Sequence, residues 1–246
     1  MIIDDHNHIW IGQATGEGWT SRPLTVDSLL SAMDRAGVDR AGICSLAQDI
    51  QNEYVLRAQR EHPDRLLGYC FVNPRDKDAP ETLRRYLGEG LVGLKLHPRL
   101  HGFPLNAMRL VDPLFEVCRE HRVHVFAHGA GLEEFNPPHY FEDVAQAFPD
   151  VTLIMGHMGA LNEVDDAIRV ASRNPNIYLD TSACDLFGVQ RAIAALGAER
   201  LLMGSDWPAS DFRLELLKIE LATEGHPGAF AQIAGGNYER LFLGNL

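Results

Sequence analysis

The sequence predicts a (β/α)8 barrel, in which eight parallel strands alternate with eight helices. Short apolar runs that suit buried parallel strands recur along the chain, and amphipathic segments separate them. Most of these runs begin roughly 25 to 30 residues after the previous one, which is the length of a βα unit. A chain of 246 residues fits one such barrel, so we expect a single domain over residues 1–246.

Eight candidate strands account for the sheet, because each is short, apolar and followed by a helical pattern. In chain order they are Ile2–Ile9, Ala41–Ala47, Leu66–Val72, Val92–Leu96, His124–His128, Thr152–Met155, Ile177–Asp180 and Leu201–Met203. An open, doubly wound sheet is the alternative fold. It favours a glycine-rich phosphate loop after the first strand, and no GxGxxG motif occurs here.

Eight helices are expected between and after these strands, because apolar residues recur there at helical spacing. They are Thr25–Ala36, Asn52–Glu61, Pro80–Leu87, Asp112–His121, Tyr140–Phe148, Glu163–Ser172, Val189–Leu196 and Phe212–Glu224. Pro80 and Pro113 suit first helical turns, whereas Gly37, Gly88 and Gly197 suit helix ends.

Composition narrows the class of protein. The chain is 46% hydrophobic and 23% charged, as in an ordinary globular protein. Its net charge of −12 argues against nucleic-acid binding but leaves a small anionic substrate open. No run approaches the ~18 apolar residues of a membrane span, and the acidic start does not resemble a signal peptide. The four cysteines form no CxxC pair, so we expect a cytoplasmic enzyme without a cysteine zinc site.

His6-Asn7-His8 ends the first expected strand and is the strongest local motif. Alternate residues on a strand point to the same side, so the two imidazoles project together from Cα atoms roughly 6–7 Å apart. That separation allows both to bind one metal ion through ~2.0–2.1 Å bonds. The alternative is a pair of core histidines with ordinary hydrogen-bond partners.

Other ionisable residues also lie where expected strands end, which is the face of a barrel that carries its active site. They are Lys95, His97, His128, His157, Asp180 and Asp206. Three longer segments are expected loops on that face: Gly12–Ser21, Leu100–Leu110 and Leu132–His139. The sequence therefore predicts a polar site built from several strand ends.

The motifs HxH, GLKLHP, GHMG and GSDWP occur in this order, and a further histidine ends the fifth expected strand. As a set they resemble the amidohydrolase superfamily, and most closely its amidohydrolase-2 branch, which includes relatives of aminocarboxymuconate-semialdehyde decarboxylase. The tail GGNYERLFL is similar to that branch's closing helix. The resemblance covers nearly the whole chain and implies a distorted barrel with a C-terminal helix and a catalytic metal.

The resemblance implies that His6, His8, His128 and Asp206 bind one divalent ion, most simply Zn²⁺, with Mn²⁺ as the alternative. Asp206 can also accept a proton from the attacking water. His157 resembles the histidine that binds substrate oxygen or exchanges protons. The alternative is a purely structural role, in which His128 and Asp206 cap turns and His157 makes a structural hydrogen bond.

Lys95 has three possible roles: an ammonium that binds a substrate carboxylate, a partner of Asp180, or a carbamylated bridge between two metals. We favour the ammonium, because the branch that the chain resembles mostly holds one metal; a second metal is expected only with carbamylation. His97 lies either in the mouth of the barrel or on a surface loop.

Further candidates surround these residues. Arg75 and Arg99 can hold a carboxylate bidentately, although arginines at such positions are often solvated rim charges. Trp10 and Trp207 flank the expected ligands and can wall the pocket against water. Asn73, Asp180 and Ser182 can orient the histidines through hydrogen bonds.

The leading interpretation is a metal-dependent hydrolase of a small ester, lactone or amide that bears a carboxylate. The second is a non-oxidative decarboxylase of an aromatic or unsaturated acid, because the resemblance implies both reactions. A non-catalytic metal or ligand carrier on the same scaffold is the third. The expected partner is a small, anionic substrate, with no nucleic acid or membrane, and a homodimer is the commonest assembly of such chains.

Overall fold

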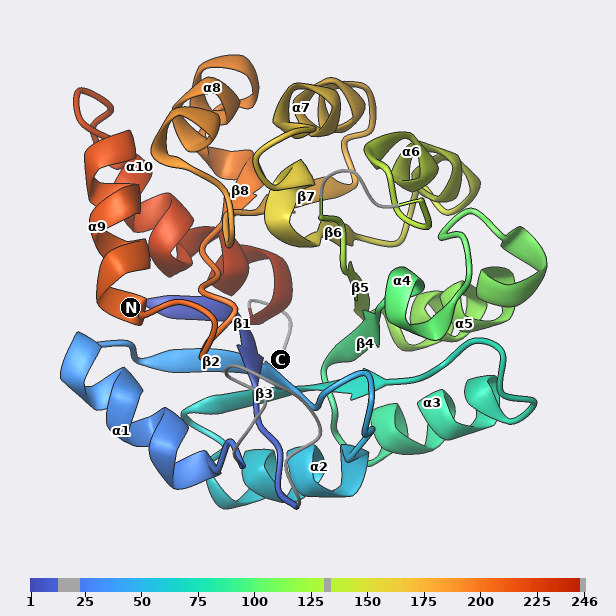
Figure 1. The fold of residues 1–246 in the computed structure, drawn as a ribbon. Coiled ribbons are helices and arrows are strands. Elements are labelled where there is room, and N and C mark those ends of the chain that lie inside the picture. Colours follow the sequence, from blue (N-terminus) through green and yellow to red (C-terminus); the bar gives the residue numbers. More distant parts are fainter. Residues whose placement is uncertain (13–22, 131–133, 244–246) are drawn as a thin grey trace.

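A computed structural model describes residues 1–12, 23–130 and 134–243 of the chain. Eight parallel strands lie side by side in chain order, so that the sheet curls into a barrel (Figure 1). The strands are β1 (Ile3–His8), β2 (Arg40–Cys44), β3 (Leu66–Phe71), β4 (Gly93–Leu96), β5 (His124–Ala127), β6 (Leu153–Met155), β7 (Ile177–Asp180) and β8 (Leu201–Leu202). The expected (β/α)8 barrel is confirmed.

The barrel closes between its first and last strands. Asn7 forms a parallel bridge with Trp207, and the backbone amides of Asp5 and His8 donate to the carbonyls of Met203 and Trp207. On its other side, β1 shifts its register with β2 between Asp4 and Asn7. This irregular pairing fits the distorted barrel that the resemblance implied.

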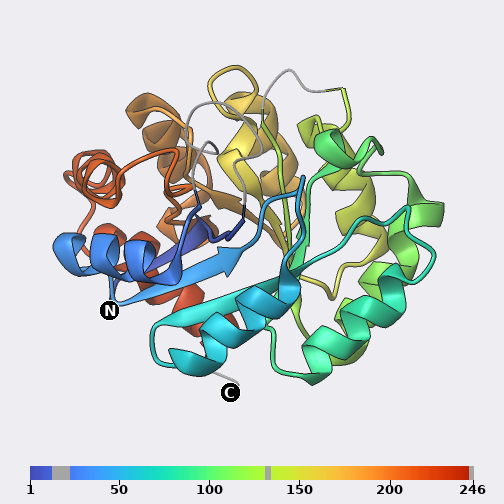
Figure 2. The same ribbon diagram turned by 60° about the horizontal axis from the view of Figure 1, so that its bottom comes forward.

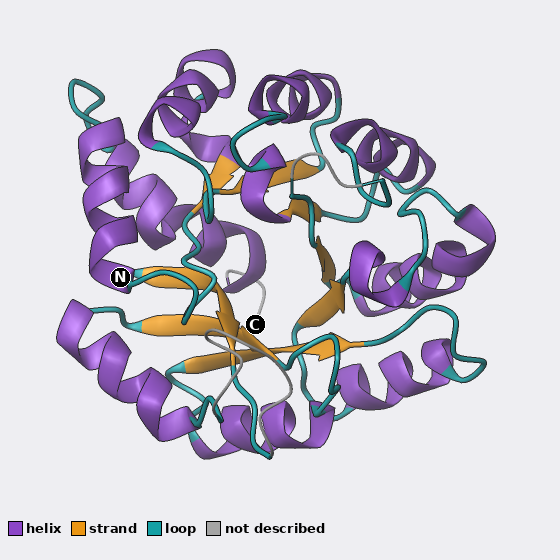
Figure 3. Ribbon diagram, in the orientation of Figure 1, coloured by secondary structure: helices purple, strands orange, loops and turns teal. Residues whose placement is uncertain are grey.

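Helices surround the strands as an outer layer (Figures 1 and 3). They are α1 (Val26–Ala36), α2 (Asn52–Glu61), α3 (Ala79–Gly88), α4 (Pro98–His101), α5 (Met108–His121), α6 (Pro138–Ala147), α7 (Val164–Arg173), α8 (Leu186–Leu196), α9 (Phe212–Ala222) and α10 (Ala229–Ala231). Thr25 caps α1 and Asp185 caps α8 by accepting backbone N–H bonds. No helix in the described ranges is both long and apolar enough to cross a membrane.

Two apolar regions hold the layers together. The larger one fills the space between strands and helices, as in other barrels. The smaller one fills the barrel interior with side chains that include Tyr69, Phe126 and Tyr178. Helical turns over Gln232–Gly236 and Glu239–Leu243 are the last elements in the described part of the chain. Tyr238, between those turns, packs into the interior cluster, so the C-terminal segment lies under the N-terminal ends of the strands (Figure 2).

Two local expectations were wrong. The segment Leu100–Leu110 is not a continuous loop, because α4 and the first turn of α5 occupy parts of it. The His97 side chain accepts the Leu100 N–H at 3.4 Å and so caps α4. Pro113 lies inside α5 rather than in its first turn, because helix-forming residues extend that helix back to Met108.

The two other expected long loops, Gly12–Ser21 and Leu132–His139, lie partly outside the described residues.

Candidate functional site

Asp4 is a buried carboxylate that ties the start of the site to its end. Its Oδ1 accepts hydrogen bonds from His6 N at 3.2 Å, from Asn7 Nδ2 at 2.9 Å and from Ser205 N at 3.1 Å. His6 belongs to the HxH motif, and Ser205 precedes Asp206. Asp4 therefore fixes the first and last strands relative to each other. This role was not predicted from the sequence, although a carboxylate within an apolar strand signals it.

Asn7, between the two histidines, also has a structural role. Its Nδ2 donates to the Asp4 carbonyl at 3.2 Å and to the Gly42 carbonyl at 3.1 Å, and its Oδ1 accepts from Ser205 Oγ at 3.4 Å. The asparagine is fully buried and links β1 with β2 and with the segment after β8. These bonds hold the HxH segment in place.

His6, His8 and Asp206 bring three donor atoms together. Asp206 Oδ1 lies 3.4 Å from His6 Nε2 and 3.1 Å from His8 Nε2. His8 Nδ1 lies 3.0 Å from the Ser45 carbonyl oxygen, so this nitrogen must donate. If His8 is neutral, its Nε2 lone pair then faces a carboxylate oxygen. This arrangement requires a proton or a metal cation between the two atoms.

The spacing of these atoms fits a metal ion. Two ligands of a tetrahedral ion with bonds of ~2.0–2.1 Å lie about 3.4 Å apart. The measured distances from Asp206 Oδ1, 3.1 and 3.4 Å, are close to that value. Imidazole nitrogen and carboxylate oxygen are also the donors that Zn²⁺ and Mn²⁺ accept. His6, His8 and Asp206 therefore fit the divalent metal ion that the family resemblance implies.

The electrostatic environment of the cluster favours positive charge between His8 and Asp206. Burial opposes a charged His8, but Cys44 and Asp206 outweigh it and raise the pKa of His8 to about 10. Burial also opposes an ionised Asp206, yet the hydrogen bond from His8 helps to lower the pKa of this carboxyl. Burial and Lys95 lower the pKa of His6, so this ring is neutral.

Cys44, which apolar neighbours in the sequence suggest is only a buried hydrophobic residue, also contacts His8. Its Sγ lies 3.4 Å from His8 Nδ1. Burial raises the pKa of the thiol, but the charge of His8 and this contact outweigh burial and lower it. No spacing in the sequence signalled this contact, because Cys44 lies on the neighbouring strand β2.

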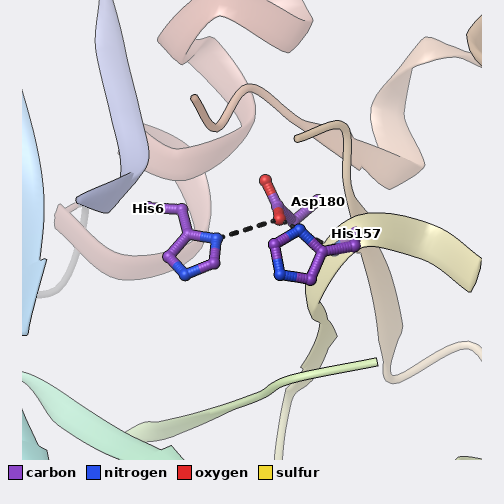
Figure 4. A group of neighbouring side chains, drawn as sticks. All are labelled: His6, His157 and Asp180. Atoms are coloured by element: carbon purple, nitrogen blue, oxygen red, sulfur yellow. Dashed lines mark hydrogen bonds and ion pairs between the residues drawn. The ribbon is translucent and has the colours of Figure 1, made fainter. Parts of the chain in front are cut away.

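His157 and Asp180 form a second group around His6 (Figure 4). Asp180 Oδ2 lies 3.4 Å from His6 Nδ1 and accepts the His157 backbone N–H at 2.9 Å. Ser182 Oγ contacts the same Asp180 oxygen and lies 2.9 Å from His157 Nδ1. His157 is held in the left-handed region at φ 61°, so its backbone bond to Asp180 supports a strained turn.

His128 joins this second group through a ring contact. Its Nδ1 lies 3.0 Å from His157 Nε2. The His97 ring stacks on it, with centroids 3.8 Å apart. His97 is therefore placed at the mouth, beside His128.

Lys95 is the cation nearest to His6. Its Nζ lies 2.8 Å from His6 Nε2 and 3.7 Å from the centroid of the Phe126 ring. The side chain is only 1% exposed, and burial lowers the pKa of its ammonium. Asp5, Asp180 and Asp206 act in the opposite direction and favour the charged form.

The remaining candidates lie further from the cluster. Arg75 is exposed and donates to the Gly102 carbonyl at 2.8 Å, and Arg99 is exposed on α4. Trp10 is fully buried, donates to Asp49 and packs with Leu24, Leu46 and the partly buried Trp207. The buried Trp10 therefore packs against Trp207, which follows Asp206 directly in the sequence.

Comparisons with known proteins are consistent with these motifs. A family model described as amidohydrolase matches residues 3–243. Comparison with curated protein sequences finds no match.

Several solved structures share the fold. A putative 2-pyrone-4,6-dicarboxylic acid hydrolase from Pseudomonas putida has a TM-score of 0.77 at 18% identity, over 100% of this chain and 98% of that one. A 2,6-dihydroxybenzoate decarboxylase from Rhizobium has a TM-score of 0.75 at 17% identity, over 100% and 99%. A dihydroxybenzoic acid decarboxylase from Polaromonas, solved with manganese and the inhibitor 2-nitroresorcinol, has a TM-score of 0.76 at 17% identity, over 100% and 97%. At these identities the likeness concerns the fold.

Proposed function

Because the chain belongs to the amidohydrolase family, we propose that it is an enzyme that uses one divalent ion, Zn²⁺ or Mn²⁺, to hydrolyse a small ester, lactone or amide bearing a carboxylate. The family expected from the strand-end motifs is confirmed by the match over residues 3–243. The observation that carries the proposal is the convergence of His6 Nε2 and His8 Nε2 on Asp206 Oδ1. His128 is proposed as a further ligand.

A divalent ion bound there supplies a Lewis acid that lowers the pKa of water and polarises a carbonyl. Asp206 is the proposed base, because its side chain is 20% exposed and so accessible to solvent, whereas the neighbouring His6 side chain is only 2% exposed. It can therefore reach a water molecule in the mouth and accept its proton. Asp206 then gives this proton to the leaving group, and His157, whose Nε2 lies 3.0 Å from His128 Nδ1, is proposed to exchange protons with the substrate oxygen.

The proposed substrate carries a carboxylate because a buried ammonium lies beside the cluster. Lys95 Nζ is 2.8 Å from His6 Nε2, and a substrate anion there would give this cation a partner. His97, Arg75, Arg99 and Trp207 are proposed to line the mouth above it, with Trp10 supporting Trp207. The large negative net charge of −12 does not oppose this, since the local field of the site decides binding.

A non-oxidative decarboxylase is the second candidate. Two of the three solved structures described above are decarboxylases of dihydroxybenzoates, and one of these holds manganese. A buried lysine suits the carboxylate of such an acid as well as that of a lactone. In this reaction an acid in the site would protonate the ring carbon from which carbon dioxide leaves.

A substrate panel separates the two reactions. The metal-loaded protein is incubated with 2-pyrone-4,6-dicarboxylate and simple lactones, and separately with 2,6-dihydroxybenzoate and related acids. Acid release without carbon dioxide supports hydrolysis, whereas carbon dioxide release supports decarboxylation. The metal-free protein and His8→Ala serve as controls, and full activity in either one contradicts the proposal. Metal analysis decides the state of Lys95, because one ion per chain excludes a carbamylated bridge.

A further inference from the structure

We propose that Ser182 is a positioning residue that sets the tautomers of His6 and His157 and, through His157, that of His128. The proposal concerns the same histidines and in that respect rests on the proposed function. Ser182 is fully buried, and its Oγ contacts Asp180 Oδ2, His157 Nδ1 at 2.9 Å and His6 Nδ1 at 3.3 Å. One hydroxyl thus lies between a carboxylate and two imidazoles.

The direction of each hydrogen bond follows from the donors available. Asp180 accepts backbone N–H bonds at both oxygens, from Ser182 at 3.2 Å and from His157 at 2.9 Å, as a carboxylate does. Ser182 has one hydroxyl proton and donates it to Asp180. Its oxygen can then only accept from the two imidazoles. His157 Nδ1 and His6 Nδ1 must therefore both carry protons.

In a neutral ring that is protonated at Nδ1, the Nε2 atom carries a lone pair. His6 Nε2 accepts from Lys95 Nζ at 2.8 Å, and this is the nitrogen that faces Asp206. His157 Nε2 accepts from His128 Nδ1 at 3.0 Å, which leaves His128 Nε2 with a lone pair. A neutral imidazole binds a metal ion through an unprotonated nitrogen. A single hydroxyl after β7 thus orients nitrogen atoms on β1 and just after β5 and β6.

The site without this hydroxyl should still fold. In Ser182→Ala, Asp180 keeps both backbone N–H bonds, and the Thr181 N–H still donates to the Leu202 carbonyl at 3.0 Å. What is lost is the acceptor of the His157 Nδ1–H group, whereas His6 Nδ1 still has Asp180 Oδ2 at 3.4 Å. We therefore expect a folded variant in which His157 exchanges between its two tautomers.

The test is ¹⁵N NMR of the imidazole nitrogens in metal-free protein labelled at histidine, with His157→Gln used to assign the His157 signals. The wild-type protein should show His157 protonated at Nδ1 and unprotonated at Nε2. Ser182→Ala should mix these two signals. Ser45→Ala is the matched control, because the buried Ser45 Oγ has no hydrogen-bond partner among the described residues and contacts His8 only through its backbone carbonyl.

A second readout is the affinity for Mn²⁺ measured by titration. Loss of a residue that orients a metal-binding histidine costs about 10- to 100-fold in affinity, and we expect a loss of that size in Ser182→Ala but not in Ser45→Ala. A wild-type His157 protonated at Nε2, or an unchanged spectrum in Ser182→Ala, overturns the inference. If Ser182→Ala does not fold, the wild-type spectrum alone still decides. If the wild-type protein binds no Mn²⁺ but shows the expected tautomers, the proposed function fails and this inference stands.

Discussion

Gly204 lies between β8 and Asp206, and we expect its replacement by alanine to disrupt the site from within the backbone. A Cβ at this position would lie 2.0 Å from Asp180 Oδ1 and 3.0 Å from His6 Cβ. Non-bonded heavy atoms are comfortable at roughly 3.5 Å, so Asp180 would have to move by more than about 1 Å. That movement breaks the bonds that Asp180 accepts from Ser182 N and His157 N.

The magnitude follows from these lost contacts. Hydrogen bonds to a charged group contribute about 1.5–3 kcal/mol each, so we expect Gly204→Ala to lower the free energy of unfolding by about 3 kcal/mol or more. A misplacement of ~1 Å at a catalytic site costs about 100-fold, so kcat/KM for the substrate found in the panel should fall by at least that factor. Urea unfolding and steady-state kinetics measure the two effects.

Gly88→Ala is the matched control for this substitution. Gly88 ends α3, and nothing lies within 4 Å of a Cβ added there. Its stability should be unchanged or raised by up to about 1 kcal/mol, because alanine favours a helix. If Gly204→Ala matches Gly88→Ala in stability and in kcat/KM, a Cβ at position 204 does not displace Asp180, and the prediction is wrong.

Three other outcomes are expected. Asp4→Ala should lower the free energy of unfolding by about 3 kcal/mol or more, because it removes the side-chain acceptor of the buried His6 and Ser205 N–H groups, each bond to a charged group contributing about 1.5–3 kcal/mol. Asp4→Asn should lose less, and chemical denaturation compares the two variants. Burial lowers the pKa of His124 to about 3, whereas the pKa of this residue in the unfolded chain is ~6.5. As the pH falls from ~6.5 towards 3, the unfolded chain binds a proton that the folded protein does not, and the free energy of unfolding falls by about 1.4 kcal/mol per pH unit. Urea unfolding should therefore show a shallower loss between pH 6.5 and pH 4 in His124→Gln, and equal slopes in the two proteins would contradict this. Dialysis against a chelator should abolish turnover, and added Zn²⁺ or Mn²⁺ should restore it. The bound ion should also raise Tm, because a metal concentration of 100 times Kd raises the free energy of unfolding by about 2.7 kcal/mol. Activity that survives complete metal removal would rule the prediction out.

The sequence predicted the barrel and its polar rim because both depend on local repetition. Each βα unit repeats the same pattern, and the carboxyl ends of parallel strands meet at one face. His6, His8 and Asp206 could therefore be grouped from the sequence, and the structure places Asp206 Oδ1 3.4 Å from His6 Nε2 and 3.1 Å from His8 Nε2. The metal-binding role of this group remains a prediction.

What the sequence could not predict depends on contacts between distant strands and on backbone strain. The contact of Cys44 with His8, and that of Ser182 with two histidines, requires knowledge of the register between strands. The positive φ of 56° at Asp206 has no local signal either, since glycine is the usual residue in that region. Helix α4 was missed because a single turn is too short to show a period.

Closure of the barrel has a consequence for how the protein matures. The donor atoms of His8 and Asp206 face each other across 198 residues of chain. During synthesis the two histidines leave the ribosome first, and their carboxylate partner arrives only after nearly every βα unit has been made. A partly made or truncated chain therefore lacks the shared contact, however much of its sheet has formed. If the site binds a metal ion through both residues, metal binding therefore indicates that the last strand has packed against the first.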